Sequence, residues 1–180
     1  MIEAFIGLGS NLGDRLANLG AAVDRLAWEP GLALRRVSLA YESEPVGPPQ
    51  PRYLNAVAQV GTLLTPRATL QRLRAIEEAV GRIRRERWGS REIDLDLLLY
   101  GDRAIDETGL QIPHPMLAER GFVLMPLEEI APEVIHPLLG VSARVLVSRL
   151  PPQERAQVLL YRPIRRSMPE PEAEDGPARE

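Results

Sequence analysis

Hydrophobic and polar residues alternate along the first part of the chain in a pattern that predicts a defined order of strands and helices. Residues 3–8 form a short apolar strand, and a glycine-rich turn at residues 7–13 leads out of it. Leucine and valine then recur at helical spacing over residues 16–26, which predicts an amphipathic helix. Residues 32–41 alternate as a second strand. Its phase slips near Arg35, which indicates a β-bulge.

The same kind of pattern continues to residue 100. Residues 53–64 alternate as a third strand, and Thr65 followed by proline gives an N-cap and first helical turn. That helix ends at Gly81, and residues 94–100 form a fourth strand. The order strand, helix, strand, strand, helix, strand predicts an α+β fold, with a ferredoxin-like βαββαβ sheet whose helices pack on one face.

Beyond this sheet the pattern predicts C-terminal additions. They are an extended piece near residues 104–106 and helices around residues 122–130 and 142–150. A chain of 180 residues is large enough for one hydrophobic core. We therefore predict a single domain at residues 1–168. Residues 169–180 carry five acidic side chains against one arginine, with several prolines, and we predict a disordered acidic tail there.

Composition excludes several classes of protein. The chain has no cysteine, so it has neither disulfides nor thiolate metal sites. All 22 basic residues are arginine, and the absence of lysine excludes P-loop NTPases and Schiff-base enzymes. Without the acidic tail the body is nearly neutral, which argues against general nucleic-acid binding. No apolar stretch is long enough for a membrane span, and we expect a cytoplasmic protein.

The strongest chemical signal is Asp94 and Asp96 within the otherwise apolar fourth strand. Alternate strand residues point to the same face, so both carboxylates share one face and Leu95 lies on the other. Two neighbouring carboxylates repel each other and lose hydration, and a magnesium ion between them would relieve both effects. A solvated pair on an edge strand is the simpler alternative, which the apolar residues that follow disfavour.

Five arginines precede this strand within residues 81–91, and Trp88 lies among them. Arginine binds phosphate oxygens in bidentate fashion, so the segment predicts a flap over a nucleotide, although a solvated charged loop is the usual reading of such a run. Elsewhere, Tyr53, Asn55 and Phe122 suit a flat heteroaromatic ligand or ordinary packing. His114 between two prolines suits a phosphate hydrogen bond or a structural role.

In these residues and their order the chain resembles the 6-hydroxymethyl-7,8-dihydropterin pyrophosphokinase family of folate biosynthesis. The resemblance rests on segments 5–14, 53–56, 87–91, 94–96, 113–115 and 119–127. It implies transfer of pyrophosphate from ATP to the hydroxymethyl group of the pterin, releasing AMP. It also implies two Mg²⁺ ions on Asp94 and Asp96, with ATP as co-substrate and a reduced pterin as the other small-molecule partner. We expect a monomer.

The resemblance implies three groups of site residues. The residues with a catalytic role are Arg82, Arg91, Asp94 and Asp96. The residues on the nucleotide side are Glu77, Arg84, Trp88, Leu97, His114 and Arg120. The residues around the pterin are Ser43, Val46, Tyr53, Asn55 and Phe122, the two rings stacking on the pterin and the asparagine meeting its polar edge.

The sequence departs from the family pattern at Ser90, where many members have proline, and at Gln111 and Pro115 near the nucleotide. Two other classes of protein stay possible. One is a magnesium-dependent nucleotidyltransferase, although more than eighty residues here separate Ser10 from the aspartate pair. The other is a ferredoxin-like RNA-binding module, but such modules cluster their aromatic residues and these eight are scattered.

Overall fold

The computed structural model describes residues 1–82 and 89–166. The predicted site residues Arg84 and Trp88 and the predicted tail at residues 169–180 therefore lie outside the described residues. The helices are α1 (Arg15–Trp28), α2 (Pro66–Val80), α3 (Gly121–Ile130), α4 (Ala143–Arg149) and α5 (Pro152–Ala156). The strands are β1 (Ile2–Ser10), β2 (Leu32–Val37), β3 (Ala40–Ser43), β4 (Tyr53–Thr62), β5 (Asp94–Tyr100), β6 (Ile105–Glu107), β7 (Leu110–Ile112) and β8 (Val158–Arg162).

One antiparallel sheet of six strands organises the molecule. Its order is β5-β1-β4-β3-β8, and β2 also pairs with β4. Strand β1 is hydrogen-bonded on both sides, so its register aligns residues of β4 and β5 that are far apart in the sequence. Gly9 lies between Asn55 and Asp94, and Gly7 lies between Val57 and Asp96.

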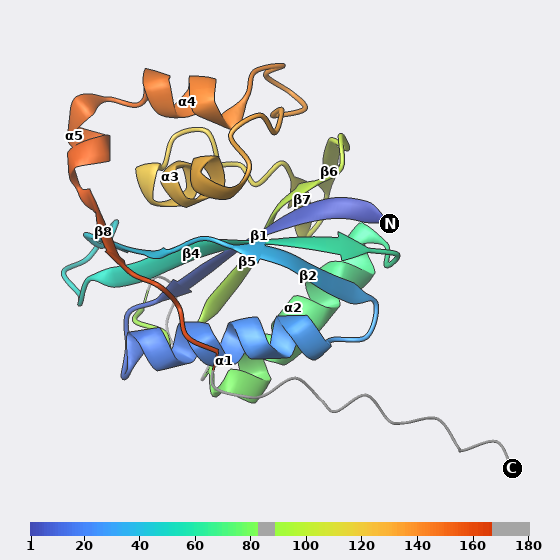
Figure 1. Ribbon diagram of the computed structural model, residues 1–180, viewed down its shortest axis with the longest axis horizontal. Coiled ribbons are helices and arrows are strands. Elements are labelled where there is room, and N and C mark those ends of the chain that lie inside the picture. The colour runs from blue at the N-terminus through green and yellow to red at the C-terminus, as the bar shows by residue number, and fades with distance from the viewer. Residues whose placement is uncertain (83–88, 167–180) are drawn as a thin grey trace, which may run out of the picture.

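Helices cover both faces of the sheet. Helices α1 and α2 lie on one face, and α3 and α4 lie on the other (Figure 1). Each face has its own hydrophobic core, the first including Ile6 and Leu19 and the second including Phe5 and Leu124. The mixed α and β architecture and the antiparallel sheet confirm the predicted α+β class. The two predicted helices lie on one face as expected, and the C-terminal helices close the other.

The N-terminal glycines do not lie where the sequence placed them. Residues 7–13 were predicted as a turn, but β1 continues through Gly7 and Gly9 to Ser10. Glycine on its own disfavours strand, but the pairing of β1 with β4 and β5 on both sides overrides that local preference. The predicted second strand is in fact β2 and β3. Ser38 separates them, because its backbone and hydroxyl both bond to Val57.

Other local predictions are confirmed. The β2–β4 register shifts between Leu34 and Arg36, at the predicted bulge. The side chain of Thr65 caps α2, and Gly81 ends it in the left-handed conformation with a φ of 111°. Helices α3 and α4 and the extended piece at β6 are also present. Helix α5 and strand β8 were not predicted. None of the described helices is long and apolar enough to cross a bilayer.

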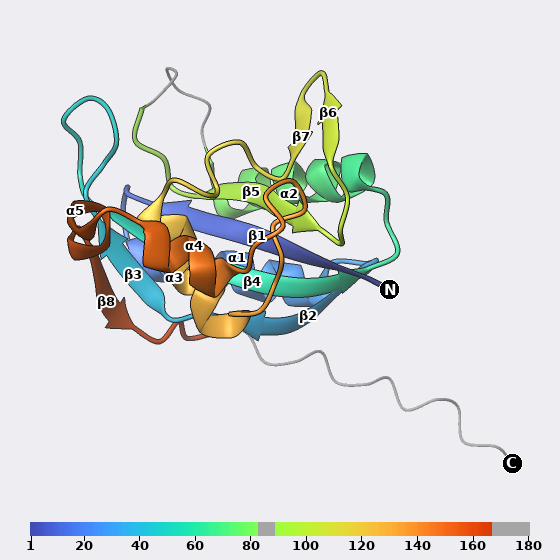
Figure 2. The same ribbon diagram turned by 90° about the horizontal axis from the view of Figure 1, so that it is seen from above.

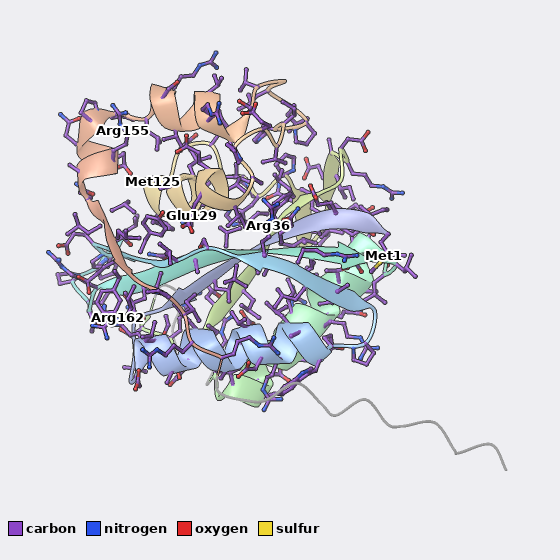
Figure 3. All side chains as sticks on the ribbon, in the orientation of Figure 1. Met1, Arg36, Met125, Glu129, Arg155 and Arg162 are labelled. Carbon is purple, nitrogen blue, oxygen red and sulfur yellow. The ribbon has the colours of Figure 1, made fainter. Side chains whose placement is uncertain are left out.

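Polar contacts fix α3 to the sheet as well as apolar packing. The carboxylate of Glu129 accepts hydrogen bonds from the backbone nitrogen of Leu39, at 3.1 Å, and from the hydroxyl of Tyr41, at 2.9 Å. Arg36 donates to the carbonyl oxygen of Ile130 at 3.0 Å. The side chains of Arg36 and Glu129 lie where α3 meets the strands (Figure 3). These bonds fix the position of α3, whose first residues line a cavity next to the sheet.

Candidate active site

A cavity of about 410 Å³ lies between the sheet and the start of α3, and we call it the main cavity because most of the predicted site residues line it. Gly7 and Gly9 form its floor, because they face it without side chains. A Cβ at Gly9 would lie 3.6 Å from the amide oxygen of Asn55 and 3.7 Å from the ring of Tyr53. The two glycines therefore keep open the space between the polar residues of β4 and those of β5.

Asp94 and Asp96 both line this cavity, as the alternation in β5 predicted. Leu95 and Leu97 point to the opposite face and belong to the core under α1 and α2. Solvent reaches Asp96 from the open cavity, but the surrounding protein limits its hydration. This desolvation, together with the negative charge of Asp94, raises the pKa of Asp96 to about 6. The positive charges of Arg91, Arg82 and Arg120 offset this rise only in part.

Two arginines already neutralise Asp94. A guanidinium nitrogen of Arg82 lies 2.8 Å from one carboxylate oxygen, and a nitrogen of Arg91 lies 2.8 Å from the other. Both arginines are partly buried, so solvent screens these contacts less than it screens surface pairs. Asp94 and the two predicted catalytic arginines form one connected group.

Glu77 extends this group beneath the sheet. It lies on α2 with 7% of its surface exposed, and its carboxylate bonds to Arg82 and, at 2.7 Å, to the backbone nitrogen of Leu95. Strand β5 ends the sheet, so this N–H depends on a side chain for its partner. Burial raises the pKa of Glu77 to about 7, although both donors favour the charged form. In this structure Glu77 supports β5 from below and does not line the main cavity.

The residues predicted to surround a pterin gather at the other end of the cavity. Ser43, Val46, Tyr53 and Asn55 line it from β3, the loop after β3, and β4. The amide nitrogen of Asn55 donates to the hydroxyl of Ser43 at 2.8 Å. The amide oxygen of Asn55 accepts no hydrogen bond from the residues that the structure describes and lies beside the glycine floor. Burial raises the pKa of Tyr53, which keeps its hydroxyl neutral.

Helix α3 and the segment before it supply the facing wall. Phe122 and Arg120 line the cavity, with the guanidinium carbon of Arg120 5.5 Å from the ring centre. His114 lines it too, and its Nδ1 accepts the N–H of Met116 at 3.2 Å. Burial lowers the pKa of His114, and the charge of Arg120 lowers it further, so the neutral ring presents Nε2 as a donor.

A second cavity, of about 700 Å³, opens beside Asp96. His114 and Asp96 line both cavities, so these two residues lie where the two spaces meet. Leu97 and Gln111 line the second one, although Leu97 is otherwise a core residue with 4% of its surface exposed. Of the predicted site residues within the described ranges, all but Arg82, Glu77 and Leu97 border the main cavity.

Sequence reasoning missed Asn11. This residue has 1% of its surface exposed, and its amide nitrogen donates to Gln50 at 2.9 Å and to the carbonyl of Pro51 at 3.2 Å. Its amide oxygen accepts the N–H of Arg91 at 2.8 Å. Asn11 thus connects the loop between β1 and α1 to the proline-rich loop and to the arginine segment. A buried asparagine after a strand was the available signal, but its partners are remote in sequence.

The donor set fits magnesium. Among residues 1–82 and 89–166 no cluster of three or more acidic or histidine side chains could hold a metal alone. Asp94 and Asp96 instead supply two hard oxygen ligands on one face of β5, open to the cavity. Mg²⁺ is commonly held by one or two carboxylates, with substrate phosphates and waters completing its octahedron. The pair is therefore suited to a metal that binds together with a phosphate ligand.

Comparison with known proteins agrees with this geometry. Residues 5–132 match the model of the 7,8-dihydro-6-hydroxymethylpterin-pyrophosphokinase family. The chain belongs to this family. The match includes most of β1, the aspartate pair, Asn55 and Phe122, and it ends just after α3.

Curated members of the family are similar over most of their length. The 2-amino-4-hydroxy-6-hydroxymethyldihydropteridine pyrophosphokinase of Synechocystis sp. is 45% identical over 147 residues, which are 82% of this chain and 75% of that protein. The protein of the same name from Methylorubrum extorquens is 41% identical, over 84% of this chain and 96% of its own length.

Solved structures show the same fold. Wild-type HPPK-DHPS from Plasmodium falciparum matches with a TM-score of 0.65 at 16% identity, over 82% of this chain. This chain spans 44% of that longer protein.

The position of Glu77 generates a prediction about stability. Glu77→Ala removes the acceptor of the Leu95 N–H, and we expect it to lower the free energy of unfolding by about 1–3 kcal/mol. Glu77→Gln keeps a carbonyl oxygen there and should lose less. Urea denaturation at neutral pH measures both variants against Gln71→Ala, an exposed change on the same helix. Equal stability of Glu77→Ala and Gln71→Ala would show that the carboxylate does not hold β5.

Proposed function

We propose that this chain transfers the terminal pyrophosphoryl group of ATP to the hydroxymethyl oxygen of 6-hydroxymethyl-7,8-dihydropterin. The products are AMP and the pterin diphosphate. The curated relatives are named as pyrophosphokinases of this hydroxymethyl pterin. The observation that carries the proposal is the shared cavity. One end is lined by Tyr53, Asn55 and Phe122, and the other by the aspartate pair.

The pterin occupies the end between Tyr53 and Phe122, where two rings on different elements face one cavity. Offset stacking contributes about 0.5–1.5 kcal/mol for each ring beyond the area that it buries. Asn55 supplies orientation, because its free amide oxygen accepts an N–H of the pterin edge. The hydroxymethyl group then points along the glycine floor towards β5.

Two magnesium ions bound at Asp94 and Asp96 with the triphosphate would neutralise phosphate oxygens and make the attacking hydroxyl more acidic. Side chains of the protein itself bind the rest of the nucleotide and its phosphates. For Arg82 and Arg91 the phosphate oxygens are an alternative partner to Asp94, because guanidinium groups bind phosphate in bidentate fashion. Their transfer to phosphate frees carboxylate oxygens of Asp94. His114 borders both cavities and Arg120 borders the main cavity, and both bind the nucleotide side.

The reaction is an in-line displacement at the β-phosphorus. A bond forms from the pterin oxygen to this phosphorus as the bond to the α,β-bridging oxygen breaks, and AMP leaves. The transferred group spreads its charge over its equatorial oxygens, so positioning and charge stabilisation provide the catalysis. We also propose that the strand order β5-β1-β4-β3 with α1 and α2 on one face is a ferredoxin-like arrangement, and that the protein acts as a monomer.

One assay tests the proposed reaction. The chain is supplied with ATP, Mg²⁺ and 6-hydroxymethyl-7,8-dihydropterin, and the nucleotide products are separated. We expect AMP and a pterin diphosphate, with turnover that Asp96→Asn lowers about 1000-fold through lost metal binding. Release of inorganic pyrophosphate with transfer of AMP would instead identify a nucleotidyltransferase. No pterin-dependent product would refute the proposal.

The arginine pair gives a second prediction. Arg82→Ala and Arg91→Ala should each lower kcat by roughly 100-fold or more while the KM for ATP changes little, because charge on the transferred group is greatest in the transition state. Steady-state kinetics at saturating pterin measures both constants. Arg144→Ala, which breaks an exposed ion pair on α4, is the matched control. A change in ATP affinity with intact kcat would contradict the catalytic role.

The amide of Asn55 gives a third prediction, about the affinity for the pterin. Asn55→Ala should raise the KM for the pterin by roughly 10- to 100-fold, since it removes an acceptor from the ligand and a donor from Ser43. The KM for ATP should stay within about twofold. Asn18→Ala is the control, because that asparagine bonds to the carbonyl of Leu12 away from the cavity. Normal pterin affinity in Asn55→Ala would place the pterin elsewhere.

A further inference from the structure

Residues 158–166 form a segment, here called the strap, that lies beyond the part of the chain matching the family model. Its first part is β8, which pairs antiparallel with β3 and places Val158 opposite Ser43. The strap starts on the side of the sheet that carries α3 and α5. It then passes the β3 edge and reaches α1 on the other side (Figures 1 and 2). It therefore links the two helical layers around the edge of the sheet.

At its first end the strap packs behind the proposed pterin pocket. Val158 has 5% of its surface exposed. A Cβ built on Gly121 would lie 2.9 Å from the carbonyl oxygen of Glu154 and 3.3 Å from a methyl group of Val158. The corner between α5 and β8 thus packs closely against the residue before Phe122. A small cavity of about 220 Å³ lies between them, and its lining includes Ser43, Val46, Phe122 and Val158.

At its second end the strap is attached to α1 by an ion pair. The Nε of Arg166 lies 3.0 Å from a carboxylate oxygen of Asp24, and the Asp24 side chain has 1% of its surface exposed. A carboxylate this deeply buried depends on its cationic partner. Ile164 packs against the core beneath it, and Arg166 also lies 6.0 Å from the ring centre of Trp28. In Figure 3, Arg162 marks the strap between its two ends, and Arg155 marks α5 before it.

Strand β3 needs such support because it is short. It has four residues, pairs with β4 only over Tyr41, Glu42 and Ser43, and leads directly into the proline-rich loop. Without β8 it would be an unpaired sheet edge, and the ends of short edge strands open readily. Ser43 is its last residue, and the Ser43 hydroxyl accepts the bond that orients the amide of Asn55.

We propose that the strap is a positioning element for the pterin half of the active site. By pairing with β3 it fixes Ser43 and through it Asn55, and by packing on Gly121 it fixes the wall that carries Phe122. The aspartate pair lies on β5 at the opposite end of the sheet order, so the nucleotide half does not depend on the strap. This inference rests on the proposed function, since it assigns the pterin to that end of the cavity.

Two truncated chains test it. The chain ending at residue 166 keeps the strap and should match the full chain in both KM values. The chain ending at residue 157 lacks the strap, and we expect its KM for the pterin to rise roughly 5- to 20-fold while its KM for ATP stays within about twofold. Equal KM values for the pterin in the two truncated chains, or equal shifts for both substrates, would overturn the proposal.

A point variant keeps the test decisive if the shorter chain does not fold. Arg166→Ala in the full chain should raise the KM for the pterin selectively, and Arg166→Lys should restore much of it. Arg144→Ala, again the control, should change neither constant. A lower melting temperature for Arg166→Ala with an unchanged KM for the pterin would show a merely structural role. If the full chain forms no pterin diphosphate, the proposed function itself fails, which is a different outcome from an active strap-less enzyme.

Discussion

The double pairing of β1 is the constraint on which the site depends. A strand bonded on both sides cannot slip by one residue without turning every side chain to the wrong face, so its register is strongly fixed. That register aligns Asn55, Gly9 and Asp94 across three strands. The two halves of the cavity belong to β4 and β5, which do not pair with each other. Only β1 sets the separation between a ligand held at Asn55 and one held at Asp94.

Within this frame, electrostatics decides which groups stay charged. Asp94 has two guanidinium partners, whereas the surroundings of Asp96 raise its pKa because they remove water without supplying an equal positive charge. The imbalance makes the Asp96 side the place where a cation gains most. Glu77 holds Arg82 near the pair and also holds the edge of β5 through Leu95. The same carboxylate therefore couples the stability of the strand to the arrangement of charges on its other face.

Much of the fold could be predicted from the sequence because its elements are periodic and well delimited. The carboxylate face of β5 followed from alternation alone, and Thr65 and Gly81 marked the ends of α2. The glycines of β1 were predicted to form a turn, because local propensity contains no information about pairing with two neighbouring strands. Strand β8 was missed because its leucines are largely exposed and its pairing partner lies more than a hundred residues away. The contacts of Asn11 could not be predicted because its partners, too, are remote in sequence.

The irregularity in β5 separates the placement of the two aspartates from the packing of the hydrophobic core, which a uniform strand would couple. Phe5 pairs with Leu99 and Ile6 with Leu97, which leaves Leu98 as an extra residue between them. Leu98 and Leu99 both belong to the core under α3, while Leu97 and Tyr100 belong to the other. The extra residue shifts the alternation of side chains between the two faces by one position. Substitutions after it can therefore adjust the packing of the core without changing the face on which the two aspartates stand.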